Sequence, residues 1–207
     1  MATHAVISAA DRARVRQAIA AAEAKTSGEI FAVVTEECED YRFIPILWAV
    51  LAAFIAPLPL IYLTQVPASL IWLIQVATFV VFSVVLSLPQ VKYFVVPRHV
   101  KREAALALAM QQFLAHGLHL TEARTGVLIF VALAERRAEI IADSGIAAKV
   151  DPAVWQGAMD RLVVEVKAGR FAEGLAVAIG AVGQTLERHF PRQPGDRNEL
   201  SDDLVVL

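Results

Sequence analysis

The strongest pattern in this sequence is a long hydrophobic stretch without charge in the middle third of the chain. Residues 43–91, 49 in all, include no Asp, Glu, Lys, Arg or His. A helix that crosses the roughly 30 Å hydrocarbon core of a bilayer needs about 20 apolar residues. The stretch divides into two such lengths, 43–63 and 70–88, with a short turn at 64–69. We therefore predict a transmembrane helical hairpin over residues 42–91.

The alternative to a membrane hairpin is a pair of helices buried in a soluble core. Helices of a soluble core normally keep a polar stripe that faces water. The uncharged stretch has no such stripe, and its overall hydrophobicity raises the apolar fraction of the chain to 57%. Ordinary soluble domains contain about 45–50% apolar residues. Both observations favour the membrane.

The basic residues predict how the hairpin is oriented, because Lys and Arg are enriched on the cytoplasmic side of membrane helices. The turn at 64–69 has no basic residue, whereas the open side of the hairpin carries five: Arg42, Lys92, Arg98, Lys101 and Arg102. We expect a two-span protein of the cell inner membrane, with both termini in the cytoplasm and the lipid bilayer as its first partner.

The segments on either side of the hairpin alternate between helical and strand patterns. Before it, an amphipathic helix ends near Lys25 and an apolar, β-branched strand spans 29–35. After it, the pattern predicts a helix, two strands and two helices, at 97–116, 127–133, 138–143, 151–169 and 171–190. One helix and one strand cannot form a core alone, so residues 1–41 and 92–190 are expected to fold together. The predicted fold class is α/β, a small sheet flanked by helices and interrupted by the hairpin.

The last residues of the chain differ in character from the rest. Residues 191–207 begin with a segment rich in Pro, Gly and charge that has no periodicity. Such a composition is typical of a linker, and we predict a disordered tail. The apolar end, Leu204-Val205-Val206-Leu207, has a second interpretation, which is docking on a partner.

Charge and cysteine content narrow the functional classes. The chain has 19 basic and 21 acidic residues, so its net charge gives no attraction for nucleic acid. A single cysteine, Cys38, excludes an intramolecular disulfide. The sequence contains no phosphate-binding loop of the Gly-x-x-x-x-Gly-Lys-Ser/Thr type, no Gly-x-Ser-x-Gly elbow and no Gly-x-Gly-x-x-Gly dinucleotide motif.

Four segments resemble a known family, two of them being residues 171–175 and 186–191. Residues 125–146, which read TGVLIFVALAERRAEIIADSGI, are similar to the central hairpin of TPM domains, and Thr26-Ser27-Gly28-Glu29-Ile30 resembles the entry into their first strand. A membrane insertion after the first strand resembles a bacterial membrane-bound branch of that family. The resemblance implies an α/β sandwich, calcium binding, a weak acid-phosphatase activity and roles in the maintenance of membrane proteins.

The chain departs from the TPM pattern at two places where the family commonly has a carboxylate. An Asp often precedes the first helix, where this chain has His4-Ala5-Val6-Ile7. Asp-Asn-Gly often precedes the second strand, where this chain has Arg124-Thr125-Gly126. A metal site of the family's kind would lack both carboxylates here.

The densest acidic cluster directly follows the first predicted strand and reads Glu36-Glu37-Cys38-Glu39-Asp40. Hard cations prefer several converging carboxylate oxygens. Glu36, Glu37 and Asp143 are therefore the candidate ligands for Ca²⁺ or another divalent cation, provided that the strand before Asp143 ends at the same edge of the sheet. The alternative interpretation is a solvated acidic connector. Glu135 and Arg136, in the turn between the second and third strands, are further candidates because they resemble the acidic-basic turn of TPM domains.

The favoured functional hypothesis is a non-catalytic one, in which a membrane-tethered TPM-like domain binds a protein partner or maintains other membrane proteins. The alternative is a weak divalent-metal-dependent phosphatase that uses Glu36, Glu37 and Asp143 around an activated water. A transport or channel subunit is a third hypothesis, which the lack of ionisable residues in the predicted spans disfavours.

Overall fold

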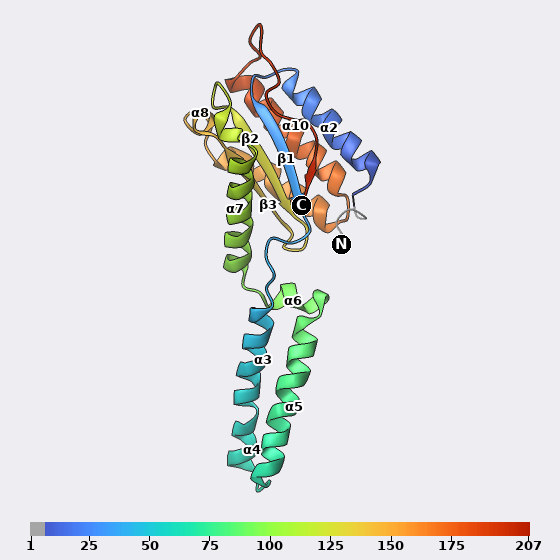
Figure 1. Cartoon of the computed structure of the whole chain (residues 1–207), viewed down its shortest axis with the longest axis vertical. Helices are drawn as coiled ribbons and strands as arrows, with labels where there is room; N and C mark the ends of the chain where they lie inside the picture. The colour runs from blue at the N-terminus through green and yellow to red at the C-terminus, as the bar shows by residue number, and fades with distance from the viewer. Residues whose placement is uncertain (1–6) are drawn as a thin grey trace. The chain divides into compact units, whose positions relative to one another are not determined.

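The computed structural model describes residues 7–207, except for the side chains of Pro89 and Gln90. Residues 4–6, part of the first departure from the TPM pattern, lie outside the described residues. The chain forms two compact units (Figure 1). One unit combines the chain up to Cys38 with Arg102–Leu207, and the other is Glu39–Lys101. The first unit is therefore built from two separate stretches of sequence.

The first unit is built on a mixed sheet of four strands in the order β3-β2-β1-β4. These are β1 (Glu29–Thr35), β2 (Gly126–Ala132), β3 (Arg137–Ala142) and β4 (Val205–Val206). β1 is parallel to both β2 and β4, whereas β3 is antiparallel to β2. Every residue of β1 and β2 is buried, which explains why both strands are continuous apolar runs rather than alternating ones. The predicted α/β class with a small sheet is confirmed.

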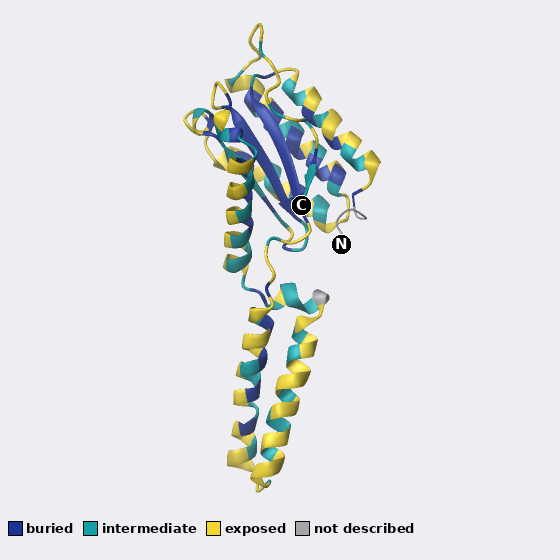
Figure 2. Cartoon of the chain, in the orientation of Figure 1, coloured by how far each residue is buried: buried dark blue, intermediate teal, exposed yellow. Residues whose placement is uncertain are grey.

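Helices cover both faces of this sheet (Figure 2). On one face lie α2 (Ala9–Glu23), α9 (Ala153–Lys167) and α10 (Phe171–His189), and on the other lies α7 (Arg98–Ala115). Alternate residues of β1 supply the two halves of the core. Ile30, Ala32 and Val34 pack with the first group of helices, and Phe31 and Val33 pack with Ala105, Ala109 and Phe113 of α7. This alternation is the period of two that a strand imposes on its side chains.

The helix α2 begins as its sequence predicts. The Ser8 hydroxyl accepts a hydrogen bond from the Asp11 amide at 3.1 Å, and the Asp11 carboxylate accepts one from the Ser8 amide at 3.0 Å. This reciprocal arrangement, a capping box, satisfies two amides that the first turn of a helix leaves without partners.

The prediction of a disordered tail is wrong. Residues 191–207 return along the sheet, and Val205 and Val206 pair in parallel with Val33 and Val34. Leu204 is only 5% exposed, and the Leu207 amide donates to the Val34 carbonyl oxygen at 3.0 Å. The polar composition of the segment made it look like a linker, but the edge of β1 supplies partners for its apolar end. We call residues 191–207 the C-terminal strap.

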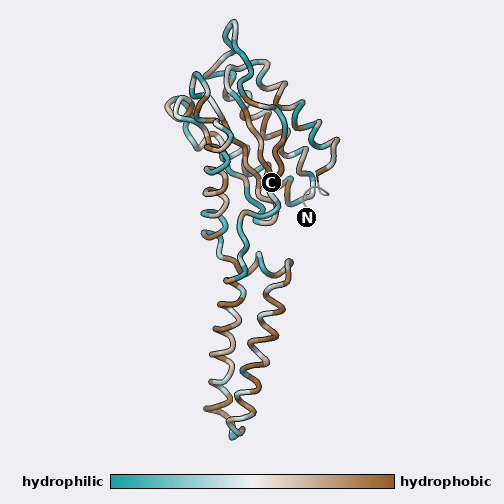
Figure 3. The backbone as a smooth tube through the Cα atoms, in the orientation of Figure 1, coloured by the Kyte–Doolittle hydropathy of each residue, from teal (hydrophilic) through white to brown (hydrophobic). Residues whose placement is uncertain are grey.

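The second unit is a helical hairpin. Its first arm consists of α3 (Phe43–Ile55) and α4 (Pro57–Leu63), its second arm is α5 (Ala68–Ser87), and the short α6 (Pro89–Val95) follows. Pro57, the first residue of α4, separates the two helices of the first arm because proline has no amide proton for the helical ladder. Both arms, Phe43–Leu63 and Ala68–Ser87, are long and apolar enough to cross a membrane. Figure 3 shows hydrophobic positions on every side of them.

Candidate functional site

The acidic segment after β1 is fastened to the turn between β2 and β3. The Leu133 amide donates to the Thr35 carbonyl at 3.0 Å, and the Ala134 amide donates to the Glu36 carbonyl at 2.8 Å. The Thr35 hydroxyl then donates to the Glu37 carbonyl at 2.8 Å. The structure thus brings Glu36 and Glu37 close to the predicted turn candidates, Glu135 and Arg136.

The Glu135 side chain is buried at this end of the sheet and links the turn to the segment after β1. It is 5% exposed, and its Oε1 accepts a hydrogen bond from the Cys38 amide at 2.9 Å. Its Oε2 is buried and has no hydrogen-bond partner among the described residues. Burial, together with the neighbouring charges of Glu135, Glu139 and Glu37, raises the pKa of the Cys38 thiol well above its ordinary value. Cys38 is therefore a poor nucleophile in this setting.

Arg136 has a different role in the same turn. Its φ of 52° places it in the left-handed region, and its amide donates to the Leu133 carbonyl at 3.2 Å. A four-residue connection between antiparallel strands commonly needs one such residue to reverse the chain. The Arg136 side chain is exposed. The two turn candidates therefore separate into a buried carboxylate and a surface cation.

Asp143 lies at the opposite end of the sheet from Glu36 and Glu37. Its amide donates to the Gly126 carbonyl at 2.9 Å, at the start of β2, and its carboxylate caps the short helix α8 (Ser144–Ala147). The reason is that β3 is antiparallel to β2, so β3 ends where β1 and β2 begin. A strand of seven residues, the length of β1, is roughly 20 Å long at about 3.3 Å per residue.

The predicted three-carboxylate cation site is therefore not formed. Glu36, Glu37 and Asp143 are about a strand's length apart, whereas a divalent cation needs its oxygens within roughly 2.0–2.6 Å. In the part of the chain that the structure describes, no group of three or more His, Cys, Asp or Glu side chains is arranged to hold a metal ion. The residues present do not fit the calcium site that the family resemblance implies.

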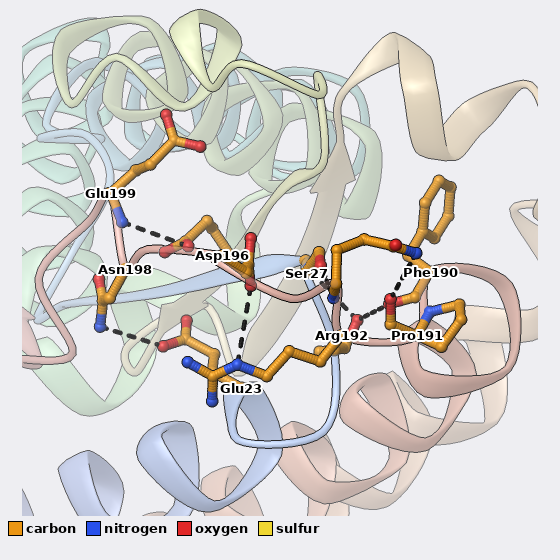
Figure 4. Close-up of polar contacts among 12 residues, drawn as sticks. Glu23, Ser27, Phe190, Pro191, Arg192, Asp196, Asn198 and Glu199 are labelled. Carbon is orange, nitrogen blue, oxygen red and sulfur yellow. Dashed lines mark hydrogen bonds and ion pairs between the residues drawn. The ribbon is translucent and has the colours of Figure 1, made fainter.

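A polar cluster that the sequence analysis missed lies where β1 begins (Figure 4). Glu23, at the end of α2, and Glu29, at the start of β1, face the C-terminal strap around a cavity of about 210 Å³. The Glu199 and Leu200 amides each donate to the Glu29 carboxylate at 3.3 Å, and Asn198 Nδ2 donates to Glu23 Oε2 at 3.4 Å. Asp196, Asp202 and Arg192 of the strap complete the lining of the cavity.

Glu23 also substitutes for a neighbouring strand. Its Oε1 accepts a hydrogen bond from the Ile30 amide at 2.7 Å. Burial raises the pKa of Glu23 to about 8, and the charges of Glu29 and Asp202 add to this effect. Burial likewise raises the pKa of Glu29. The only sequence signal for this cluster is Glu29 itself, an acidic residue at the head of an apolar strand.

A second hollow lies between α9 and α10. It measures about 600 Å³ and is lined by two exposed valines, Val164 and Val177, and by charged side chains. Two of these, Arg170 and Glu165, form an ion pair of 2.7 Å.

Comparison with known proteins supplies a family and a fold. Residues 89–185 match the model of the TPM domain, a region that begins at α6 and includes α7, β2, β3, α9 and most of α10. The chain is similar in structure to the BA42 protein from the psychrophilic bacterium Bizionia argentinensis, solved by NMR, with a TM-score of 0.61 and 19% sequence identity. That similarity covers 97% of this chain and 95% of BA42, and at this identity it concerns the fold alone. No curated protein matches the sequence significantly.

Proposed function

We propose that this chain, whose residues 89–185 match the TPM domain, acts as a membrane-tethered, non-catalytic module that binds a protein partner and serves the maintenance of other membrane proteins. The proposal has three parts: the tether, its orientation and the binding role of the domain.

The observation that carries the tether is the exposure of the hairpin. None of the residues of α5, all of which the structure describes, is buried, and in the first arm Phe43 is 85% and Leu63 82% exposed. Keeping one large apolar side chain in water costs about 1.5–3 kcal/mol relative to burying it. More than ten such side chains would cost tens of kcal/mol, more than the roughly 5–15 kcal/mol that stabilises a whole domain. A bilayer around the hairpin removes this cost.

The polar groups of the hairpin are suited to a medium without water. The Thr64 hydroxyl donates to the Leu60 carbonyl, and the Thr78 hydroxyl donates to the Ile74 carbonyl at 2.8 Å. Hydroxyls satisfied within their own helix add little to the cost of entering hydrocarbon. At the other end, Trp48 Nε1 donates to the Val95 carbonyl at 3.3 Å, and the rings of Tyr41 and Tyr93 meet edge to face. Aromatic residues of this kind gather at the membrane–water interface.

For the orientation, we infer that both soluble segments lie in the cytoplasm and that the membrane is the inner membrane of a bacterial cell. The support is the asymmetry of the basic residues, five on the open side of the hairpin and none in its turn. The test is labelling of a single cysteine at Thr64, in a Cys38→Ser background, with a membrane-impermeant thiol reagent. Labelling from the periplasmic side is expected, and labelling only after the cells are broken would overturn the orientation.

For the binding role, the support is the family together with the geometry of the carboxylates. The candidate ligands do not converge, whereas the hollow between α9 and α10 offers exposed apolar and charged side chains to a partner. A tether restricts the domain to the membrane surface, which raises its effective concentration near the cytoplasmic segments of other membrane proteins.

The test is photo-crosslinking in intact cells from positions Val164 and Arg136, on two different surfaces of the domain. We expect one membrane protein to be captured repeatedly from at least one of them. A divalent-metal phosphatase would give another result, a robust metal-dependent hydrolysis of phosphate esters that Glu36→Gln or Asp143→Asn abolishes. That outcome would replace the binding proposal with an enzyme.

A further inference from the structure

Two different parts of the chain supply hydrogen-bond partners to the outer edge of β1, the edge that faces away from β2. At Ile30 the amide is satisfied by the Glu23 side chain, not by a strand. At Val33 and Val34 the edge is paired with β4, a strand of only two residues. An edge strand presents amide and carbonyl groups to which another extended segment can add. β1 already holds one such segment.

The segment that holds this position has few strong contacts. Of residues 191–207, Leu204 is the one buried residue, and the others are exposed or half-buried. Besides β4, the strap donates two part-buried hydrogen bonds to the Glu29 carboxylate, and Arg16 and Asp203 form an exposed ion pair of 3.6 Å. The exposed ion pair contributes little to stability, so β4, Leu204 and the hydrogen bonds to Glu29 hold the strap in place.

The side chains of β4 define what this edge accepts. Leu204 and Val206 pack into the core on the side of α2, α9 and α10, whereas Val205 packs into the core on the side of α7. The edge therefore takes consecutive apolar residues that alternate between the two faces of the sheet, in an extended segment parallel to β1. Branched side chains such as those of Val205 and Val206 suit this position.

The charges around the edge make the strap an imperfect ligand. Asp202 of the strap lines the cavity together with Glu23 and Glu29, so acidic groups face one another there, whereas Asp196 is paired with Arg192 at 3.9 Å. A segment with a neutral or basic residue in place of Asp202 would avoid this repulsion. The edge would favour such a segment over the chain's own end.

We propose that the outer edge of β1 is the peptide-docking site of this domain, that the C-terminal strap occupies it in the unbound protein, and that the partner displaces β4 with an extended apolar segment. The inference rests on the binding role proposed above and deepens it by naming the chemistry of the partner. Such a partner adds a strand to an existing sheet, in which backbone hydrogen bonds supply affinity and alternate side chains supply specificity.

The experiment uses the full chain in detergent micelles and a variant that ends at Asp203. The probe is a fluorescein-labelled peptide with the sequence of residues 198–207, NELSDDLVVL. We expect the peptide to bind the shortened chain at least ten times more tightly than the full chain, in which the strap competes. A peptide with Leu207→Pro should bind more weakly, because proline removes the amide that donates to the Val34 carbonyl oxygen. A peptide with Asp202→Asn should bind more tightly than the unchanged one.

A second variant covers the case in which the shortened chain does not fold. Leu204→Ser in the full chain removes the buried anchor of the strap and keeps every backbone group, and it should bind the peptide at least ten times more tightly than the unchanged chain. Three outcomes would overturn the inference: equal binding of the peptide to all of these chains, no binding to any folded variant, or binding of the Leu207→Pro peptide as tight as that of the unchanged peptide.

The result is also separable from the binding role itself. Repeated crosslinks to one membrane protein, combined with no peptide binding to the β1 edge, would keep the binding role and remove this docking site. Peptide binding at the β1 edge without any crosslinked partner would keep this docking site and remove the support for the proposed role at the membrane.

Discussion

Replacing Glu23 with Gln should change how the stability of the protein depends on pH. The substitution keeps the size of the side chain and an oxygen that accepts from the Ile30 amide, but it removes the carboxyl proton. In the folded protein the pKa of Glu23 is about 8, and the ordinary value is 4.5. The folded state therefore binds more protons than the unfolded state between these pH values, so the free energy of unfolding falls as pH rises through this window.

The magnitude follows from the size of the shift. A change of one pKa unit corresponds to about 1.4 kcal/mol, so the whole shift would be worth about 5 kcal/mol in a fully buried site. Glu23 is only half-buried, and solvent screening reduces the effect to an expected loss of about 1–2 kcal/mol for the unchanged protein between pH 5 and pH 8.5. Glu23→Gln should escape this loss and become more stable than the unchanged protein at the upper end of the range.

The assay is thermal unfolding in detergent at pH values from 5 to 9. About 1–2 kcal/mol corresponds to roughly 2–8 °C in the midpoint for a chain of this size. The matched control is Glu187→Gln, an exposed glutamate of α10, which should leave the curve parallel to that of the unchanged protein. Glu29 and Glu139 also have pKa values raised by burial, and they add to the pH dependence of every variant. The effect of Glu23 is therefore read from the difference in unfolding midpoint between Glu23→Gln and the unchanged protein at each pH. A constant difference across the range would refute the reasoning.

Three further predictions test other parts of the structure. Gly126→Ala places a Cβ 2.4 Å from the Leu118 carbonyl oxygen, whereas Gly157→Ala meets nothing within 4 Å. In thermal unfolding, the first substitution should lower the free energy of unfolding by about 1–3 kcal/mol, and the second, inside α9, should raise it by up to about 1 kcal/mol. Equal effects of the two would contradict the close packing at the start of β2. Glu135→Gln removes a charge that raises the pKa of Cys38, so the rate at which a thiol reagent labels Cys38 at pH 8.5 should rise at least twofold, and an unchanged rate would show that burial alone controls this thiol. Chemical denaturation should show that Leu186→Ala, at a fully buried position of α10, destabilises the domain by about 2–5 kcal/mol. Val177→Ala, at an exposed position of the same helix, should change the stability by less than about 0.5 kcal/mol.

Local patterns were sufficient for most of the elements. The uncharged run from Phe43 predicted both helical arms, because length and composition alone decide whether a helix can cross hydrocarbon. β1 and β2 could also be predicted from the sequence, because a strand covered by helices on both faces is an almost continuous apolar run. The break in the first arm was not predicted, although Pro57, whose missing amide proton interrupts the helical ladder, accounts for it.

The candidate site failed at the step that depends on strand direction. Asp143 was grouped with Glu36 on the condition that their strands end at one edge, and periodicity carries no information on direction. Connection length does: only four residues link Ala132 to Arg137, which is enough for an antiparallel hairpin and too short for a parallel crossover. That signal was present in the sequence and would have placed Asp143 at the far edge.

The strap could not have been recognised by the same means. Its order depends on a groove formed by β1 together with both helical layers, and no pattern within residues 191–207 encodes that groove. The cluster around Glu23 and Glu29 has the same origin, because its members are far apart in the sequence and meet only when the chain returns to β1.

The insertion of the hairpin between β1 and the rest of the domain has a consequence for biosynthesis. β1 leaves the ribosome long before β2, its parallel neighbour, and the 90 residues that lie between Thr35 and Gly126 take about 5–20 s to synthesise. During that time a strand with seven buried positions has no sheet to join. If the hairpin is inserted in a membrane, as we propose, the domain can close only after insertion has left both ends of the hairpin on one side. A failed insertion would leave β1 exposed, and quality-control proteases could recognise that nascent chain.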